Sequence, residues 1–506
     1  MKRALALLLA AILALLCAAC GEMPVPMSGE IVDAAQLRIG LEAEPASLDP
    51  ALCTDPMEAT LLHHLYEGLT AVQEDGSVIG AAAESWKATT TKDAAKRTVY
   101  TFTLREDACW SDGTPVKAED FIYAWTRIIT GETECPCRYL FDVIHNASCY
   151  HAAEDVAEEE AEEAEKPELG LEAKDERTLV VTLEGECAAF PRMVSAPAFY
   201  PQREDKVQCC NGAYALAEWV HDDHLTLAKN ENYRAAAEVS GLTLEFVIRD
   251  ADTLRALAEQ NELQASFGVT LNAAELTGSS GTDFYYFFNT EKVTDVKVRA
   301  ALLALTEEST AEISGMDGSA DAEAAVDEKK ALLAEVETLP EQLTLLVCGA
   351  EESAAAVQAQ AYADLWQEGL GLPVTVKALP YDEFCAAREA GEYDLIRCAV
   401  TADYEDPAVL LGFFQSEAAG NWALYSQEDY DELMKKSRSE TDDAERLALL
   451  GEAKAFLEED VVLIPLRSGV TVMACSPQLS DVRCNALGVW DFTHAEYQMR
   501  EAAATE

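Results

Sequence analysis

Strand-like and helix-like segments alternate along this chain without any repeat. Short runs of β-branched, aromatic and other apolar residues predict strands at 36–41, 99–104, 179–183, 226–227, 284–288, 343–347 and 374–378. Apolar residues at helical spacing predict helices at 58–69, 118–129 and 354–370. Because 506 residues exceed what one hydrophobic core usually holds, the pattern predicts two or three mixed α/β lobes.

The first twenty residues have the layout of an export signal. Lys2 and Arg3 precede an apolar run over 4–16 that is too short for a comfortable transmembrane helix. The small residues around Cys20 resemble the lipobox of bacterial lipoproteins, which implies that Cys20 is the cleavage point and carries lipid. Residues 1–20 are therefore expected to be a lipoprotein signal, and a plain secretory signal cut nearby is the alternative. No later apolar run approaches membrane length, so a soluble body tethered by its lipid is expected.

The charge of the chain excludes some partners. It has 92 acidic and 37 basic residues, with a formal net charge of -55. Nucleic acids and anionic membrane surfaces would repel such a protein. The acidic run at 153–170 is expected to be a solvated helix or a disordered insert.

Cysteine and histidine residues do not form a metal pattern. Of 15 cysteines, Cys17 would leave with the signal and Cys20 would carry lipid, which leaves 15 - 2 = 13. Their spacings lack the paired CxxC sets of a zinc site, so no metal and no cofactor are expected. Whether these cysteines form disulfides or stay free is left open. The segment 221–224, His-Asp-Asp-His, could be a metal pair, and a hairpin turn is favoured.

Seven segments resemble one family, in its order and spacing. They are EPASLDP (44–50), LYEGL (65–69), AESWKAT (83–89), YTFTLREDACWSDGTPVKAEDFIYAWTRI (100–128), NGAYALAEWVHDDHLTLAKNENY (211–233), YYFFNT (285–290) and DLIRCAVTADYEDP (394–407). Together they resemble the extracytoplasmic peptide-binding proteins of ABC importers, solute-binding family 5, from Gln36 to at least Leu466. Within them, Trp110, Phe121 and Trp125 are expected to lie in the core.

The resemblance implies an α/β, two-lobed periplasmic-binding-protein-like fold of type II with an extra inserted domain. After a linker at 21–35, the first lobe is expected to be discontinuous, with segments 36–61, 178–272 and 487–506. The inserted domain is expected at 62–177 and the other lobe at 273–486. The stretch 310–331 is shorter than in the family, where a loop there lies near the ligand, so the resemblance leaves the pocket size open.

The resemblance also nominates ligand-binding residues. In oligopeptide-binding members, the aspartate of an R-x-x-W-x-A-D-Y segment holds the α-ammonium of the peptide. Asp403 matches this aspartate and is followed by Tyr404. Val400 stands where the family usually has a Trp that walls a side-chain pocket. Arg397 matches a family arginine, which could pair with a ligand carboxylate or with a neighbouring acid. Thr54 and Pro56 match a ligand-facing loop.

The expected function is therefore that of a lipid-anchored, extracytoplasmic, monomeric binding protein. It would close over a peptide and deliver it to an ABC permease. An exported peptidase is a remote alternative, because the chain has no HExxH, no GxSxG and no phosphate loop. A protein of the same fold for another solute, such as a metal chelate or a sugar, is the nearer alternative.

Overall fold

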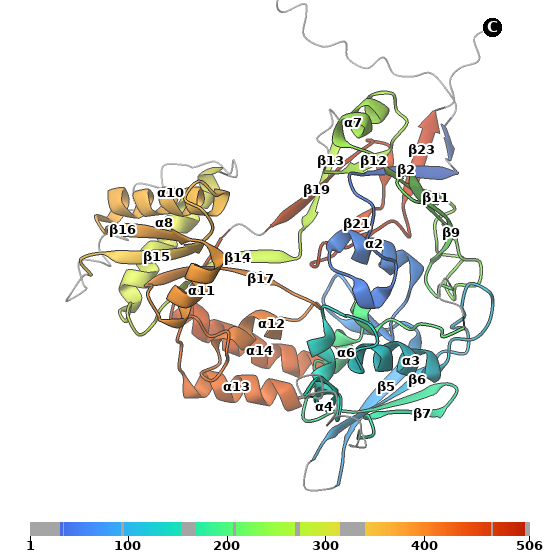
Figure 1. The fold of residues 1–506 in the computed structure, drawn as a ribbon, viewed down its shortest axis with the longest axis horizontal. Helices are drawn as coiled ribbons and strands as arrows, with labels where there is room; N and C mark the ends of the chain where they lie inside the picture. The colour runs from blue at the N-terminus through green and yellow to red at the C-terminus, as the bar shows by residue number, and fades with distance from the viewer. Residues whose placement is uncertain are drawn as a thin grey trace, which may run out of the picture.

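The protein has two lobes joined by a narrow connection (Figure 1). The computed structural model describes residues 31–33, 35–92, 96–152, 167–205, 209–268, 274–313, 340–466 and 469–500. The signal with Cys20, the acidic run at 153–166 and the stretch 314–331 lie outside the described residues. We call 282–466 the second lobe and the remaining described residues the first lobe. The predicted mixed α/β, two-lobed fold is confirmed.

A seven-stranded sheet forms the base of the first lobe. Its strands, in spatial order, are β13 (Ala274–Ser279), β19 (Val470–Cys475), β12 (Ala265–Phe267), β2 (Gln36–Leu41), β11 (Thr243–Ile248), β10 (His224–Lys229) and β9 (Tyr214–Val220). β2 is central and parallel to both neighbours, and its Leu37 and Ile39 are fully buried. The turn between β9 and β10 contains Asp222, so the expected hairpin at 221–224 is confirmed. Helix α7 (Ala251–Glu259) packs beside this sheet through Leu254.

A four-stranded sheet and several helices complete the first lobe. The strands are β5 (Ala83–Thr90), β6 (Thr98–Leu104), β8 (Thr178–Thr182) and β7 (Leu171–Asp175). The helices are η1 (Pro50–Leu52), α2 (Pro56–Leu65), α3 (Ala118–Ile129), η2 (Arg138–Val143), α4 (Ser148–Ala152), α6 (Phe190–Met193) and η3 (Pro197–Phe199). The remaining short strands are β1 (Ile31–Asp33), β3 (Thr70–Val72), β4 (Val78–Gly80), β20 (Leu479–Ser480), β21 (Arg483–Cys484), β22 (Trp490–Asp491) and β23 (Glu496–Arg500).

Local signals explain helix α3. Asp120 accepts hydrogen bonds from Lys117 N at 2.8 Å and from Trp110 Nε1 at 3.0 Å, which fixes the first turn. Trp110, Phe121 and Trp125 are fully buried, as predicted. The segment 110–125 thus acts as a folding element.

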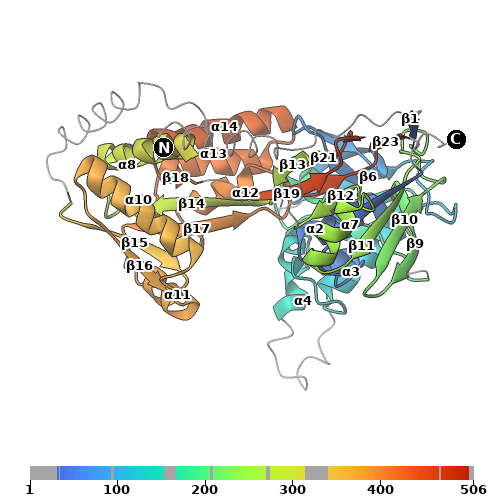
Figure 2. The same ribbon diagram turned by 90° about the horizontal axis from the view of Figure 1, so that it is seen from above.

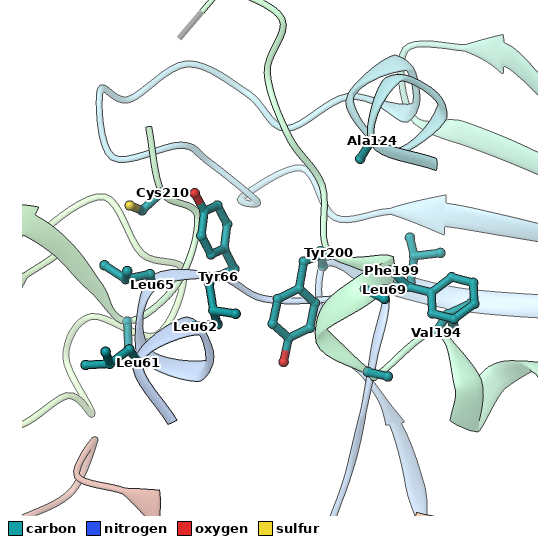
Figure 3. Close-up of a cluster of buried hydrophobic side chains, with 14 of the residues drawn as sticks. Leu61, Leu62, Leu65, Tyr66, Leu69, Ala124, Val194, Phe199, Tyr200 and Cys210 are labelled. Atoms are coloured by element: carbon teal, nitrogen blue, oxygen red, sulfur yellow. The ribbon is translucent and has the colours of Figure 1, made fainter. Parts of the chain in front are cut away.

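Helix α2 ends earlier than predicted. Asp55 caps its start by accepting from Met57 N and Glu58 N, and the helix stops at Leu65 rather than at residue 69. Tyr66 has extended backbone angles, so it and Leu69 leave the helix and still pack into the core. Figure 3 shows this cluster, with Leu61, Leu62, Leu65, Tyr66, Leu69, Val194, Phe199 and Tyr200. Burying these side chains stabilises the protein more than a longer helix α2 would.

The second lobe contains a five-stranded sheet between helices. Its strands are β16 (Val374–Leu379), β15 (Leu343–Cys348), β17 (Leu395–Thr401), β14 (Thr282–Phe288) and β18 (Leu463–Pro465). Its helices are α8 (Val296–Ile313), α10 (Ala354–Leu370), α11 (Tyr381–Glu389), α12 (Ala408–Leu411), η4 (Gly412–Phe414), α13 (Glu428–Ser439) and α14 (Asp443–Glu459). Separate apolar clusters cover the two faces of the sheet. Among the helices that the structure describes, none combines the length and the apolar character needed to cross a bilayer.

Two strand segments connect the lobes, as Figure 2 shows from above. β13 continues into β14 through Ser280 and Gly281, and β19 lies beside β13. Ser280 N donates to Gly469 O at 3.0 Å, and Gly469 N donates to Thr282 O at 2.9 Å. The expected domain boundaries at residues 62, 178, 273 and 487 stay predictions. The strands β8, β13 and β19 pair within the sheets of the first lobe.

Candidate ligand-binding site

Asp403 lies at the boundary between the two lobes. It follows β17 of the second lobe in the loop at 402–407. Its Oδ1 accepts from the thiol of Cys137 at 3.7 Å, and its Oδ2 accepts from the hydroxyl of Tyr139. Both donors come from the first lobe, at the start of η2. The structure thus brings an anionic group of one lobe against the surface of the other.

The groups around Asp403 are neutral donors. Burial, followed by the charge of Asp403, raises the pKa of Cys137 to about 12. Burial and the hydrogen bond to Asp403 also raise the pKa of Tyr139. Across the described ranges, no lysine or arginine forms an ion pair with Asp403. The carboxylate is therefore held in place without a positive partner.

The three residues after Asp403 have different surroundings. Tyr404 packs against the core of the first lobe, and burial raises its pKa. Burial also raises the pKa of Glu405, whose side chain accepts a hydrogen bond from the backbone of Ala486. The side chain of Asp406 is fully buried and pairs with Arg446 at 2.7 Å. Of these acids, Asp403 is the one that faces only neutral donors.

Arg397 and Val400 lie on opposite faces of β17. The guanidinium of Arg397 stacks over the ring of Phe284, 4.6 Å from its centre, and its buried Nε has no hydrogen-bond partner in the described part of the chain. Val400 is 9% exposed and packs into the apolar cluster that contains Phe287 and Leu346. Successive side chains of a strand point to opposite faces of the sheet, so two residues that are three positions apart lie on opposite faces. The structure does not bring Val400 to the face that carries Arg397.

Thr54 is exposed in the loop that leads into α2, and Pro56 is the exposed first residue of α2. Glu58, which is 2% exposed, organises this loop by accepting from Ala46 N at 3.0 Å and from Thr54 N at 2.8 Å. Burial raises the pKa of the neighbouring Cys53 to about 12, with a smaller contribution from Cys137. The loop therefore lies on the same side of the first lobe as the donors to Asp403.

The cysteines near the site are free. All thirteen described cysteines, from Cys53 to Cys484, are thiols without a disulfide. The alternative left open by the sequence is thus resolved in favour of free thiols in this structure. His221 and His224, the other candidate ligands, bind carboxylates at 2.7 Å, of Glu44 and Asp223 respectively.

A two-lobed α/β fold with a carboxylate at the boundary between its lobes is the architecture expected of a protein that closes over a solute. A family model described as bacterial extracellular solute-binding proteins, family 5 Middle, matches residues 77–422. The chain therefore belongs to this family, whose members are binding proteins.

Three named relatives cover most of the chain. The periplasmic murein peptide-binding protein MppA of Escherichia coli K12 is 27% identical over 87% of this chain and 89% of its own length. The periplasmic oligopeptide-binding protein OppA of the same strain is 27% identical over 91% and 94%. The probable deoxycholate-binding periplasmic protein YgiS, also of that strain, is 28% identical over 87% and 89%. The unliganded open form of MppA has a TM-score of 0.79 at 24% identity, over 94% of this chain and 99% of that one, and shows the fold.

Proposed function

We propose that this protein is an extracytoplasmic peptide-binding protein that captures peptides between its lobes by their free amino terminus. The observation that carries the proposal is the carboxylate of Asp403, which stands at the lobe boundary with neutral donors and no cationic partner in the described part of the chain. A peptide ammonium that leaves water needs an anionic partner, because an unpaired buried charge is expensive. Asp403 would supply that partner.

Arg397 supports a second ligand contact. Its guanidinium stacks on Phe284 and forms no ion pair within the described ranges, which favours a ligand carboxylate over a neighbouring acid as its partner. A strand advances by about 3.3 Å per residue, so the four steps from Arg397 to Thr401, the last residue of β17, cover roughly 13 Å, and Asp403 follows two positions later. An extended peptide of a few residues could reach from one charge to the other. Its main chain would provide most of the remaining hydrogen bonds, as in β-strand recognition of varied sequences.

Delivery of the peptide to an ABC permease completes the proposed function. Membership of the extracellular solute-binding family supports it. In this proposal the protein works as a monomer, anchored to the membrane by lipid on Cys20, and Thr54, Pro56 and Tyr404 lie along the ligand path. A Cys20→Ala variant should move from the membrane fraction to the soluble fraction. Unchanged membrane recovery would refute the anchor.

A solute other than a peptide is the second candidate. The observation that favours it is the relative named as a probable deoxycholate-binding protein, which is as similar to this chain as the peptide-binding relatives. An acidic, amine-free solute would use Arg397 and leave Asp403 without a role.

Native mass spectrometry of the protein purified from its source organism tests the proposal. The expected result is a set of masses above the protein mass that correspond to peptides. A single non-peptide mass, or a metal, would contradict peptide binding and favour the second candidate.

A further inference from the structure

Arg192 crosses the boundary between the lobes next to the candidate site. It lies in α6 of the first lobe, where its neighbours Phe190 and Met193 are buried in the core. Its Nη1 donates to the backbone oxygen of Glu405 at 3.2 Å, and its Nε lies 3.5 Å from Asp406 Oδ2. Glu405 and Asp406 belong to the second lobe, in the loop that carries Asp403. One side chain therefore ties this loop to the opposite lobe.

The surroundings of Arg192 hold it in a single position. Its guanidinium also binds both carboxylate oxygens of Asp443 of α14, at 3.1 and 2.7 Å, and donates to Gly76 O at 2.5 Å. Arg192 is 3% exposed and its partner Asp406 is fully buried. Arg446, 2% exposed, binds Asp406 at 2.7 Å from within the second lobe. Two arginines and two aspartates thus balance in charge. Arg192, Asp406 and Arg446 are buried and Asp443 is 39% exposed, so loss of Arg192 removes one partner from the buried charge of Asp406.

A second contact strengthens the junction at the same place. Ala188 N in the first lobe donates to Arg438 O of α13 at 2.8 Å. Only two residues separate Asp406 from Asp403, so the contacts of Arg192 and the hydrogen bonds from Cys137 and Tyr139 hold the same short loop against the first lobe. The loop has no regular secondary structure that could hold Asp403 by itself.

We propose that Arg192 is a positioning residue for the ligand site. It fixes the loop at 402–407 against the first lobe, so that the Asp403 carboxylate keeps its place beside Cys137 and Tyr139. The consequence for binding rests on the proposed function, whereas the effect on the loop does not. Arg446 contacts the same aspartate from within its own lobe and cannot provide the link between lobes.

Hydrogen–deuterium exchange of the ligand-free protein tests the position of the loop. In Arg192→Met, the amides of Ala402, Ala408 and Val409 should exchange more than about tenfold faster than in the wild type, while β14 and β17 stay protected, because these amides at the loop and its end donate to Gly281 and to Asp406. Arg234→Met is the matched control, because Arg234 binds Glu67 within the first lobe, and it should leave this loop unchanged. If Arg192→Met does not fold, Arg192→Lys, which cannot hold all these partners, should show a smaller increase. Wild-type exchange in the loop of a folded Arg192 variant would overturn the proposal.

A double-mutant cycle tests the consequence for binding, with trialanine as the probe. Arg192→Met should weaken binding about tenfold in the wild type and less than about twofold in the Asp403→Asn background, since it acts through Asp403. Equal losses in both backgrounds would show that Arg192 does not act through Asp403. If the wild type binds no peptide, the proposed function fails, and the exchange measurement still decides the role of Arg192.

Discussion

The carboxylate of Asp403 accepts a hydrogen bond from the hydroxyl of Tyr139, a residue 264 positions earlier in the chain and in the other lobe. Tyr139 is 55% exposed, so this bond holds the two lobes together at the surface of the candidate site. A hydroxyl that donates to a carboxylate forms a charge-assisted bond.

Tyr139→Phe removes only this hydroxyl. We expect the free energy of unfolding to fall by about 0.5 to 1 kcal/mol, at the lower end for such bonds because the site is partly solvated. Urea unfolding of Tyr139→Phe, of Asp403→Asn and of the double variant measures the coupling free energy between the Tyr139 hydroxyl and the Asp403 carboxylate. A loss of the same size in the Asp403→Asn background would mean that the hydroxyl has another partner.

The environment of Val400 gives a prediction that separates the structure from the family pattern. The resemblance implies a Trp at this position in the family, whereas Val400 is packed in the apolar cluster that contains Phe287 and Leu346. Val400→Trp should therefore overpack the cluster and destabilise the protein by about 1 to 3 kcal/mol. Ala399→Trp, at the exposed neighbouring position, is the control and should change stability little. Equal stability of the two variants would place the side chain at 400 in open space.

Gly281 is required at the connection between the lobes. Its φ is +72°, and a Cβ there would lie 2.6 Å from the backbone oxygen of Leu487. Gly281→Ala should lower the free energy of unfolding by about 1 to 2 kcal/mol because of the left-handed backbone alone. The clash of the added Cβ with the oxygen of Leu487 should lower it further. Gly451→Ala in α14, where a Cβ meets nothing within 4 Å, should instead stabilise by about 0.5 to 1 kcal/mol. Thermal unfolding of both variants checks the opposite signs.

His63 and His64, adjacent in α2, have opposite pKa shifts. Burial lowers the pKa of His64 to about 4, and its Nε2 accepts from Phe492 N at 2.9 Å, so the native ring is neutral. Burial alone would also lower the pKa of His63, but its hydrogen bond and charge interaction with Asp491 outweigh burial and raise it.

These shifts predict opposite effects of pH. Between the ordinary pKa of 6.5 and about 4, the unfolded chain binds a proton at His64 that the native protein does not, so stability falls as the pH falls through this window. The His63 contribution is fully present below the ordinary pKa and is lost as the pH rises through its raised native pKa. Comparing urea unfolding at pH 7.5 and 4.5, we expect His64→Gln to reduce the acid-induced loss by about 2 kcal/mol and His63→Gln to enlarge the loss. Changes of the same sign in both variants would contradict the assignment.

The parts of the fold that depend on local sequence signals can be predicted from the sequence. Helices 118–129 and 354–370 were predicted with the observed bounds, because capping residues and apolar spacing agree there. The end of α2 was predicted wrongly because burial of Tyr66 and Leu69 depends on distant parts of the chain. Cys137 and Tyr139 were not recognised as partners of Asp403, since no local pattern encodes a contact between segments so far apart. The nearest signal was the Cys135-Pro136-Cys137 spacing, which indicated nothing about a ligand.

The central claim is that Asp403 binds the ammonium of a peptide. Calorimetric titration of one tetrapeptide, with a free and with an acetylated amino terminus, tests it against the wild type, Asp403→Asn and Glu405→Gln. We expect the acetylated peptide not to bind, and Asp403→Asn to weaken binding of the free peptide by on the order of 2 to 5 kcal/mol, about 30-fold or more. Glu405→Gln should change it by less than about 0.5 kcal/mol. Equal affinities for the two peptides, with small and equal losses in both variants, would contradict the claim.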